Sequence, residues 1–423
     1  MISILALLGL LLIVGLMRQQ SALIMISSVL IVSVGAFSWW SRTASRRLRY
    51  ARSFAPPRIF PGERTDYVVK LSNEKLLPLP WVRIEEHLPD ALIPSTADAP
   101  PQSKAPPQSN DQPGGAATSY WRRHRIVALG WHEELEIRHP FTCMKRGEYR
   151  VGPTDIETGD PLGLFPVYTQ IPETSSLIVY PRPASISEII NDSASPFGTT
   201  SAQPPALEDP ARFAGLRDYQ PGDPRRWVDW KASARRLKLQ TRVFTPTTLS
   251  TRIVALNVQT MPFTWQGYDA ELLEGAIGIT TSLVRDSILG GDPVGLACNS
   301  CGVGMEDFQV FLRPNRRPTQ LEDALTALAR LSPLPTMAFG SMLRRIAANF
   351  PYGASLVAVT AYLDELIAED LAVLAHSGHA VSLVVAGGEL PMYVDKRIRV
   401  FHFPHVEFEE LQGFGVLARG DGP

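Results

Sequence analysis

The sequence TRIVALNV, residues 251–258, holds an uninterrupted apolar run at residues 253–256. Such a run is typical of a strand that is buried on both faces of a mainly parallel sheet. The segment that follows, residues 268–289, has apolar side chains at helical spacing, including Leu272, Ala276 and Leu283. A buried strand followed by an amphipathic helix is the repeating unit of α/β folds.

The same alternation continues toward the C-terminus. We expect strands at residues 293–298, 354–363 and 379–388, and helices at residues 319–331 and 365–378, with Thr319 as an N-cap. Residues 215–423 therefore predict a short N-terminal segment followed by a Rossmann-like α/β domain. In that domain we expect helices on both faces of a mostly parallel sheet. Ligands of such sheets bind at the carboxyl ends of the strands.

The segment before this domain, GLRDYQPGDPRRWVDWKASARR at residues 215–236, is rich in aromatic and charged residues. Asp223 and Pro224 fit a helix start, which predicts a helix over residues 224–237. One stripe of that helix carries the apolar residues that we expect to be buried: Trp227, Trp230, Ala234 and Leu237.

The polar residues of the same segment predict local contacts. Gly222 permits the positive φ of a type II turn, and the Tyr219 hydroxyl can bond to that turn. Asp229 lies off the apolar stripe, where it can pair with Arg225 or Arg226 one turn earlier.

Charge is concentrated in this region, because residues 217–242 carry eight basic and three acidic side chains. One interpretation is a structural clasp between two domains. The other is a basic docking face for an acidic partner or for anionic headgroups. Catalysis ranks third, because the segment has no histidine and its acids have basic neighbours that hold them ionised. The candidate interaction or clasp residues are Tyr219, Gly222, Asp223, Arg226, Asp229, Trp230, Lys231 and Arg235.

Residues 51–190 show the pattern of an all-β sandwich. Segments such as 64–73 and 81–89 alternate apolar and polar residues with period two, which places Tyr67, Val69 and Leu71 on one face. Residues 95–119 are rich in Pro, Ser, Gln and Gly and predict a disordered insert. Residues 191–214 have a similar composition and predict a linker.

Two apolar runs begin the sequence, at residues 2–17 and 22–40, with only residues 18–21 between them. The second run is long enough to cross a bilayer, and the first is slightly short. We expect residues 1–50 to form a transmembrane helical hairpin, and a cleaved signal peptide is the alternative. Five arginines and no acid at residues 42–52 predict a two-pass cell-membrane protein with a cytoplasmic C-terminal part.

Residues 219–244, YQPGDPRRWVDWKASARRLKLQTRVF, resemble the signature of a bacterial and archaeal family, the domain of unknown function 58 (DUF58) proteins. Residues 61–86 and 145–165 are also similar to that family. The resemblance implies a membrane-anchored protein in which a β-sandwich precedes a von Willebrand factor type A-like domain. It further implies association with MoxR-type AAA+ ATPases and other membrane proteins, as an adaptor in the assembly or maturation of other proteins.

Type A domains often hold a divalent cation through Asp-x-Ser-x-Ser after the first strand. Here Asn257, Gln259 and Met261 stand at those positions, so we expect a degenerate site and no bound metal. The sequences CNSC, HSGH and HFPH lack the four converging ligands of a zinc site, and the three cysteines favour no disulfide framework. The sequence has neither a phosphate-binding loop nor a nucleophile elbow, and we expect no cofactor.

These features favour a non-enzymatic membrane-anchored adaptor whose type A-like domain binds proteins. A net charge of −1 gives no general attraction to nucleic acid. The alternative is a hydrolase or cell-envelope enzyme with a dispersed active site, for which a perturbed acid in a pocket lined by Asp223 and Asp229 would be evidence. A purely structural tether is a third possibility. The sequence leaves the partner's identity and the oligomeric state open.

Overall fold

A computed structural model gives the fold of this protein. It describes residues 2–89, 92–94, 120–186, 208–220, 227–246, 251–302, 309–348, 354–387 and 394–409. The predicted insert at residues 95–119 lies outside the described residues, as does most of the predicted linker. The chain divides into two compact units, Met1–Pro181 and Arg182–Pro423.

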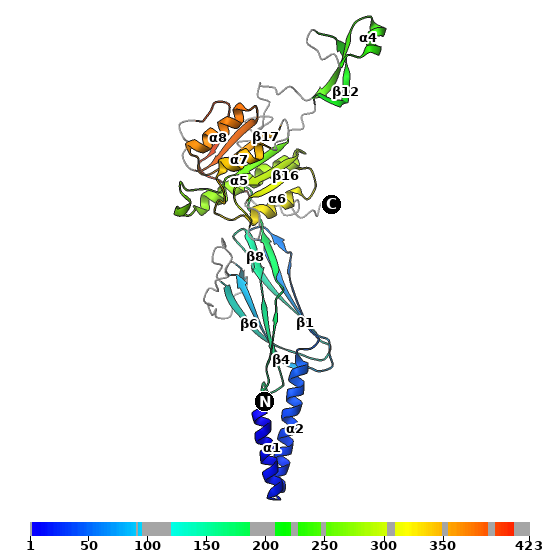
Figure 1. The fold of residues 1–423 in the computed structure, drawn as a ribbon, viewed down its shortest axis with the longest axis vertical. Coiled ribbons are helices and arrows are strands. Elements are labelled where there is room, and N and C mark those ends of the chain that lie inside the picture. Colours follow the sequence, from blue (N-terminus) through cyan, green and yellow to red (C-terminus); the bar gives the residue numbers. More distant parts are fainter. Residues whose placement is uncertain are drawn as a thin grey trace. The chain divides into compact units, whose positions relative to one another are not determined.

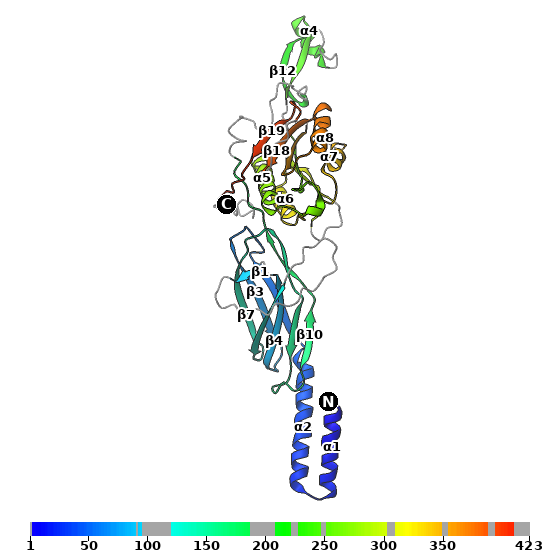
Figure 2. The ribbon, with the colours of Figure 1, turned by 90° about the vertical axis from the view of Figure 1, so that its left-hand side faces the viewer.

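Two apolar helices, α1 (Ile2–Met17) and α2 (Ser21–Ala44), begin the first unit and lie side by side (Figures 1 and 2). α2 has 24 residues and is long and apolar enough to cross a membrane, whereas α1 is shorter, with 16 residues. Within the described part of the chain, α2 is the one helix that meets both criteria. The prediction of an apolar helix near the N-terminus that is long enough to cross a membrane is confirmed by length and composition.

The C-terminal end of α2 is tied to the strands that follow it. The ammonium group of Lys75 donates to the carbonyl oxygens of Thr43 (3.0 Å) and Arg46 (2.8 Å), and also to that of Ala44. Burial lowers the pKa of Lys75 to about 8. A cation at this place satisfies carbonyl groups that the last helical turn leaves unpaired, and it complements the negative end of the helix dipole.

The rest of the first unit is built from β-sheets. One four-stranded sheet has the order β1 (Leu48–Ala55), β3 (Arg64–Asn73), β7 (Glu134–Thr142) and β5 (Ile93–Pro94). The other has the order β10 (Val167–Ile171), β9 (Thr154–Thr158), β4 (Leu79–Pro89) and β6 (Tyr120–Leu129). A three-stranded sheet has the order β2 (Arg58–Ile59), β11 (Ser175–Val179) and β8 (Gly147–Val151).

The two four-stranded sheets pack face to face, and we call them the two-sheet module. Leu71 of β3 shares one hydrophobic cluster with Ile84 of β4 and Ile156 of β9. The residues expected on the inner face of β3 are all buried, namely Tyr67, Val69 and Leu71. The predicted period-two alternation of this strand is therefore confirmed.

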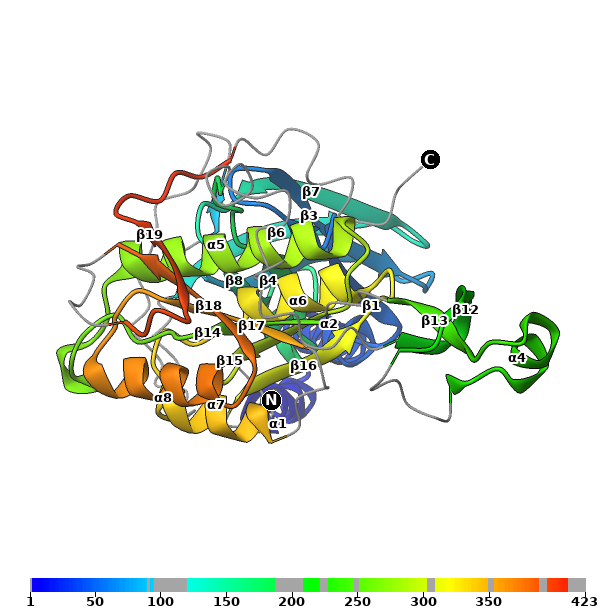
Figure 3. The ribbon, with the colours of Figure 1, turned by 90° about the horizontal axis from the view of Figure 1, so that it is seen from above.

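The second unit contains a six-stranded sheet with helices on both faces (Figure 3). Its strand order is β16 (Val310–Asn315), β15 (Val294–Cys298), β14 (Arg252–Leu256), β17 (Ser355–Thr360), β18 (Ala380–Ala386) and β19 (Arg399–Phe403). Only β16 is antiparallel to its neighbour. The predicted α/β sheet, mostly parallel, is confirmed.

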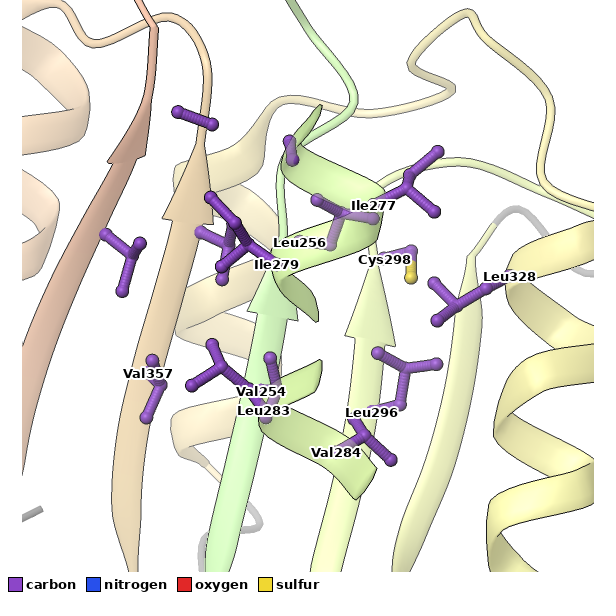
Figure 4. Packing of buried hydrophobic residues seen from close by; sticks show 14 of the residues in the cluster. Val254, Leu256, Ile277, Ile279, Leu283, Val284, Leu296, Cys298, Leu328 and Val357 are labelled. Atoms are coloured by element: carbon purple, nitrogen blue, oxygen red, sulfur yellow. The ribbon is translucent and has the colours of Figure 1, made fainter. Parts of the chain in front are cut away.

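Alternate side chains of the central strand enter different cores. Val254 and Leu256 of β14 pack with α5 (Ala270–Leu289) and α6 (Gln320–Ala329), as Figure 4 shows for several members of this cluster. Ile253 and Ala255 face α7 (Phe339–Ala347) and α8 (Glu365–His376) instead. The apolar run at residues 253–256 is thus explained by burial on both faces.

Several details differ from the sequence-based expectations. β16, α7 and β19 were not among the expected elements, although α7 has an amphipathic sequence. Thr319 precedes α6 but makes no side-chain capping bond, whereas Asp269 and Asp364 cap α5 and α8. A further strand, β12 (Glu208–Asp218), begins inside the segment expected to be a linker.

β12 pairs in antiparallel register with β13 (Gln240–Pro246), and a short helix, α4 (Trp230–Arg236), lies between them in sequence. We call the described residues from 208 to 246 the arm. β13 leads into β14 through residues 247–251, so the chain connects the arm to the amino end of the central strand of the sheet.

Candidate functional site

Asp229 organises the tip of the arm. Its Oδ1 accepts a hydrogen bond from the backbone N–H of Ala232 (3.0 Å), which caps α4, and its Oδ2 accepts one from Nε of Arg242 (3.0 Å). Its own backbone N–H donates to the carbonyl oxygen of Gln240 (2.9 Å). The Ala232 N–H and, next, the Arg242 guanidinium lower the pKa of Asp229. Asp229 is therefore a structural anion that holds helix and strand together.

The predicted helix over residues 224–237 is not continuous, and residues 224–226 lie outside the described residues. α4 begins at Trp230, because Asp229 has extended backbone angles and acts as the cap. Val228, just before it, forms a bridge with Thr241 of β13. Asp229 forms an ion pair with Arg242 of β13, and the expected partners Arg225 and Arg226 lie outside the described residues.

The predicted buried stripe is wrong for three of its four residues, and the fourth, Trp227, is half-buried. The side chain of Trp230 is 70% exposed and that of Leu237 is 91% exposed, and Ala234 is exposed as well. Val228 and Ser233 are buried in their place. A helix of seven residues that contacts only one strand pair has no hydrophobic core against which a full apolar stripe can pack.

The structure brings together only part of the predicted candidate set. Lys231 and Arg235 lie exposed on α4, and the backbone N–H of Tyr219 donates to the carbonyl oxygen of Leu239 (2.9 Å). Gly222, Asp223 and Arg226 lie outside the described residues, together with the predicted turn. The described arm tip presents an exposed basic surface with two exposed apolar side chains, which we call the basic face: Trp230, Lys231, Arg235, Arg236, Leu237, Lys238 and Arg242.

At the carboxyl end of β14, three buried uncharged side chains form a network. Asn257 Nδ2 donates to Oγ1 of Thr360 (3.0 Å), and Asn299 Nδ2 donates to Oδ1 of Asn257 (2.8 Å). The Oδ1 of Asn299 accepts from the backbone N–H of Val258 (2.9 Å). These residues follow β14, β15 and β17, at the point where the strand order reverses and α/β sheets bind ligands.

The residues expected at a degenerate metal site have different roles, although the backbone N–H of Gln259 donates to Oδ1 of Asn257 (3.1 Å). Asn257 belongs to this network, whereas the amide of Gln259 donates to the carbonyl oxygen of Met261 (2.9 Å) and so stabilises a turn. Asp364, a nearby carboxylate, accepts from the N–H of Ile367 (2.8 Å) as a helix cap. Divalent cations usually bind through at least one carboxylate, whereas the side chains of this network are amides and a hydroxyl that already bond to one another. The described residues contain no cluster of three or more His, Cys, Asp or Glu with metal-site geometry.

The loop after β14 exposes aromatic side chains at the same edge of the sheet. The rings of Phe263 and Trp265 stack with centroids 5.6 Å apart, and their side chains are 57% and 78% exposed. Tyr268 follows, 46% exposed. Thr260 closes the loop by accepting from the backbone N–H of Asp269 (2.8 Å). Sequence reasoning missed this exposed aromatic loop, although three aromatic residues within six positions were a visible signal.

A buried polar layer crosses the two-sheet module. Oε1 of Glu86, 5% exposed, accepts hydrogen bonds from the hydroxyls of Tyr67 (2.6 Å) and Tyr50 (2.7 Å). Register places Glu86 opposite Arg123, and the guanidinium of Arg123 contacts Nδ1 of His139 at 3.0 Å. Burial, Arg123 and then Arg125 lower the pKa of His139 to about 4.

This layer separates two hydrophobic clusters. Leu88 and Phe141 belong to the cluster on one side, and Leu79 and Ile84 belong to the cluster on the other side. The two Tyr hydroxyls are deprotonated less easily than usual, because burial and then the charge of Glu86 raise the pKa of Tyr50 and of Tyr67. The layer is thus a set of fixed donors around one buried carboxylate, and the sequence analysis did not single it out.

Comparison with known proteins identifies the arm and the start of the sheet as the recognisable part of the chain. Residues 215–336 match the family model described as "Protein of unknown function DUF58". The DUF58 resemblance expected from residues 219–244 is confirmed for this segment, which covers less than a third of the chain.

A curated relative is the uncharacterised protein YeaD of Bacillus subtilis (strain 168), which is 24% identical over 252 residues. The match covers 60% of this chain and 56% of YeaD, so the chain spans little more than half the length of that relative.

Solved structures resemble only part of the chain. A CARDB domain from Pyrococcus furiosus is 13% identical, with a TM-score of 0.19, and the match covers 31% of this chain and 91% of that domain. A collagen-binding domain from a Staphylococcus aureus adhesin is 9% identical, with a TM-score of 0.18, and the match covers 31% of this chain and 99% of that domain. Scores of this size support no argument about function.

Proposed function

We propose that this protein is a non-enzymatic, membrane-anchored adaptor that docks acidic partner proteins through the basic face of its arm. The observation that carries the proposal is the composition of the arm tip. Residues 230–242 contain five basic side chains and no acid, and Trp230 and Leu237 are largely exposed among them. Exposed aromatic and apolar groups within a charged surface are typical of protein-binding sites.

The architecture supports an anchored adaptor. We infer that α1 and α2 form a two-pass transmembrane hairpin, that the two-sheet module is a β-sandwich, and that the six-stranded sheet belongs to a von Willebrand factor type A-like domain. The central position of β14 and the antiparallel edge strand β16 support the last inference. The arginines after α2 favour a cytoplasmic location for both modules.

The chemistry at the carboxyl edge supports metal-independent binding. Asn257, Asn299 and Thr360 satisfy one another without a carboxylate, so partner recognition at this domain needs no bridging cation. The enzymatic alternative requires an acid whose pKa is shifted toward neutrality. Asp229 has the opposite shift, because capping and Arg242 stabilise its ionised form.

We infer that the partner system includes a MoxR-type AAA+ ATPase, acting in the assembly or maturation of other proteins. The test is capture of a purified MoxR-type ATPase by the detergent-solubilised full chain. The Lys231→Glu/Arg235→Glu variant should recover at least about tenfold less ATPase than the wild type, because like charges would then face an acidic partner.

A matched control is Arg316→Glu/Arg317→Glu, which makes the same change of charge at two exposed residues outside the arm. That control should recover the ATPase as well as the wild type does. Equal recovery by all three proteins, each with an unchanged unfolding midpoint, would reject docking through the basic face and leave the structural clasp.

A further inference from the structure

The edge of the sheet that carries the exposed aromatic loop is strongly acidic. Residues 257–274 and 361–370, which follow the carboxyl ends of the neighbouring strands β14 and β17, contain seven acids and no Lys, Arg or His. Asp269 and Asp364 cap helices, and Asp370 pairs with Arg344. The remaining acids include three exposed glutamates, Glu271, Glu365 and Glu369.

The same edge presents apolar surface. Phe263, Trp265 and Tyr268 are exposed on the loop after β14, and Leu366, 70% exposed, lies at the start of α8 after β17. We call these four residues with Glu271 and Glu365 the acidic aromatic edge. Stacked, exposed Trp and Phe rings offer π faces to which arginine and lysine side chains bind favourably.

The basic face of the arm is complementary to this edge in both respects. Besides Arg242, which pairs with Asp229, the basic face offers four exposed cations where the edge offers carboxylates, and each surface also has exposed aromatic or aliphatic side chains. Arginine, tryptophan and tyrosine, which dominate the energetics of protein interfaces, occur on the two surfaces together. Opposite charge of this kind also accelerates association and selects the partner.

Chain connectivity places the two surfaces at opposite ends of β14. The arm joins the sheet at the amino end of that strand, whereas the acidic aromatic edge lies at its carboxyl end. Because the two complementary surfaces adjoin opposite ends of one strand, the arm of one molecule can bind the edge of a second molecule. A contact between two different surfaces of identical chains is heterologous and propagates head to tail.

We propose that the arm of one copy of this protein docks on the acidic aromatic edge of a second copy, so that the chain assembles head to tail. This inference rests on the proposed function, because both treat the arm as a docking surface. Here the partner of the arm is a second copy of the chain. Lys231 and Arg235 of one copy face Glu271 and Glu365 of the next, and Trp230 and Leu237 meet the Phe263–Trp265 stack.

Sedimentation of the full chain in detergent tests the proposal through two complementary variants. The arm variant is Lys231→Glu/Arg235→Glu, and the edge variant is Trp265→Ala/Glu271→Lys. All four positions are exposed, so neither variant removes a buried contact. Wild-type mass should rise with protein concentration beyond the dimer and fall as salt is added, because exposed charges are screened.

Each variant alone should sediment as a monomer, with self-association weakened at least about tenfold. An equimolar mixture of the two should form dimers and nothing larger, because it contains one intact arm and one intact edge per pair. Arg316→Glu/Arg317→Glu and Trp131→Ala, in which Trp131 is 72% exposed in the two-sheet module, are the matched controls and should assemble like the wild type.

A wild-type protein that stays monomeric at all concentrations would overturn the proposal, as would a mixture of variants that forms no dimer. If the arm serves another protein or an anionic lipid surface instead, the wild type stays monomeric. In that case the arm variant alone would still lose ATPase capture or flotation with phosphatidylserine vesicles. A monomeric wild type overturns self-docking. The ATPase capture experiment tests the proposed function separately.

Discussion

Glu86 is a charged residue in an unusual place, a carboxylate only 5% exposed inside the two-sheet module. Its position was visible in the sequence, because period two continues from Val82 and Ile84 to residue 86 and places that side chain inward. The partners that make the burial tolerable were not visible. Tyr50 and Tyr67 come from strands of the opposite sheet, and sequence alone does not give the register between sheets.

We predict that Glu86→Gln destabilises the two-sheet module by about 1–3 kcal/mol, because the neutral amide accepts hydrogen bonds more weakly and adds donors that have no partner there. Hydrogen exchange of peptides from β3 and β4 would report the loss. Glu85→Gln is the control, since the Glu85 carboxylate lies in a more exposed pair with Arg122 and should contribute under about 1 kcal/mol. Equal effects of both substitutions would contradict a special role for Glu86.

His139 predicts a dependence of stability on pH. Burial and the charges of Arg123 and Arg125 lower its pKa to about 4 in the folded state, while the unfolded chain keeps a value near 6.5. The unfolded state therefore binds the proton first. Neutral His139 therefore makes its full contribution to the free energy of unfolding above a pH of about 6.5. That contribution falls as the pH drops toward about 4, by at most about 3 kcal/mol.

Urea unfolding at pH 7.5 and pH 5, compared between wild type and His139→Gln, measures this contribution. The wild type should lose more stability on acidification than the variant does, because glutamine does not titrate. Parallel losses in the two proteins would show that protonation of His139 is not disfavoured by folding.

At the scale of elements, the strands and helices of the sheet were largely predictable and the arm was not. β14 and β17 are apolar runs because both faces of each strand are covered, and that burial leaves a direct trace in composition. The arm has no such core. The periodic spacing of Trp227, Trp230 and Leu237 therefore predicted a buried stripe, but Trp230 and Leu237 are exposed, and Asp229 caps α4.

Two of the elements that the sequence analysis missed, β16 and β19, are only partly buried, whereas α7 was missed although its inner face is buried. β16 exposes Phe311 while Val310 is buried, and it contains Pro314, which disfavours a strand in sequence-based reasoning. The aromatic loop was missed for a related reason. Phe263 and Trp265 look like core residues by composition, and only the fold shows that they remain exposed.

We predict that Asp229→Ala loosens the arm tip, because it removes both the cap of α4 and the ion pair with Arg242. Backbone amides of residues 230–236 should exchange with solvent roughly fivefold faster, as expected for a lost N-cap. Asp229→Asn retains a capping oxygen and should exchange at nearly the wild-type rate. Unchanged exchange in Asp229→Ala would mean that the cap does not hold the helix.

The amide network at the carboxyl edge leads to a prediction about metal. Millimolar Mg²⁺ should leave the thermal unfolding midpoint of the wild type unchanged, because the network contains no carboxylate. Asn299→Ala should lower the midpoint, since it leaves the Val258 N–H and the Asn257 Oδ1 each without one bond. A rise in the wild-type midpoint with Mg²⁺ would contradict metal-independent recognition.

At the scale of the whole molecule, the proposed function combines an apolar N-terminal anchor with a docking arm. Hydrogen bonds from Lys75 hold the C-terminal end of α2 against the two-sheet module. The module is therefore attached directly to the apolar helix that precedes it. The second unit carries two surfaces of opposite charge, at residues 230–242 and at the acidic aromatic edge. The sequence revealed the basic surface through its charge count, whereas the acidic surface appears only once β14 and β17 are known to be neighbours.

The most direct test of the central claim is photo-crosslinking in native membranes, with the reactive amino acid placed at Leu237, which is 91% exposed on the basic face. A probe at Leu76, 75% exposed in the two-sheet module, gives the background. We expect protein adducts at Leu237 that exceed those at Leu76 and disappear in Lys231→Glu/Arg235→Glu. Adducts at Leu237 that are confined to lipid, or that do not exceed those at Leu76, would contradict an adaptor that works through its arm.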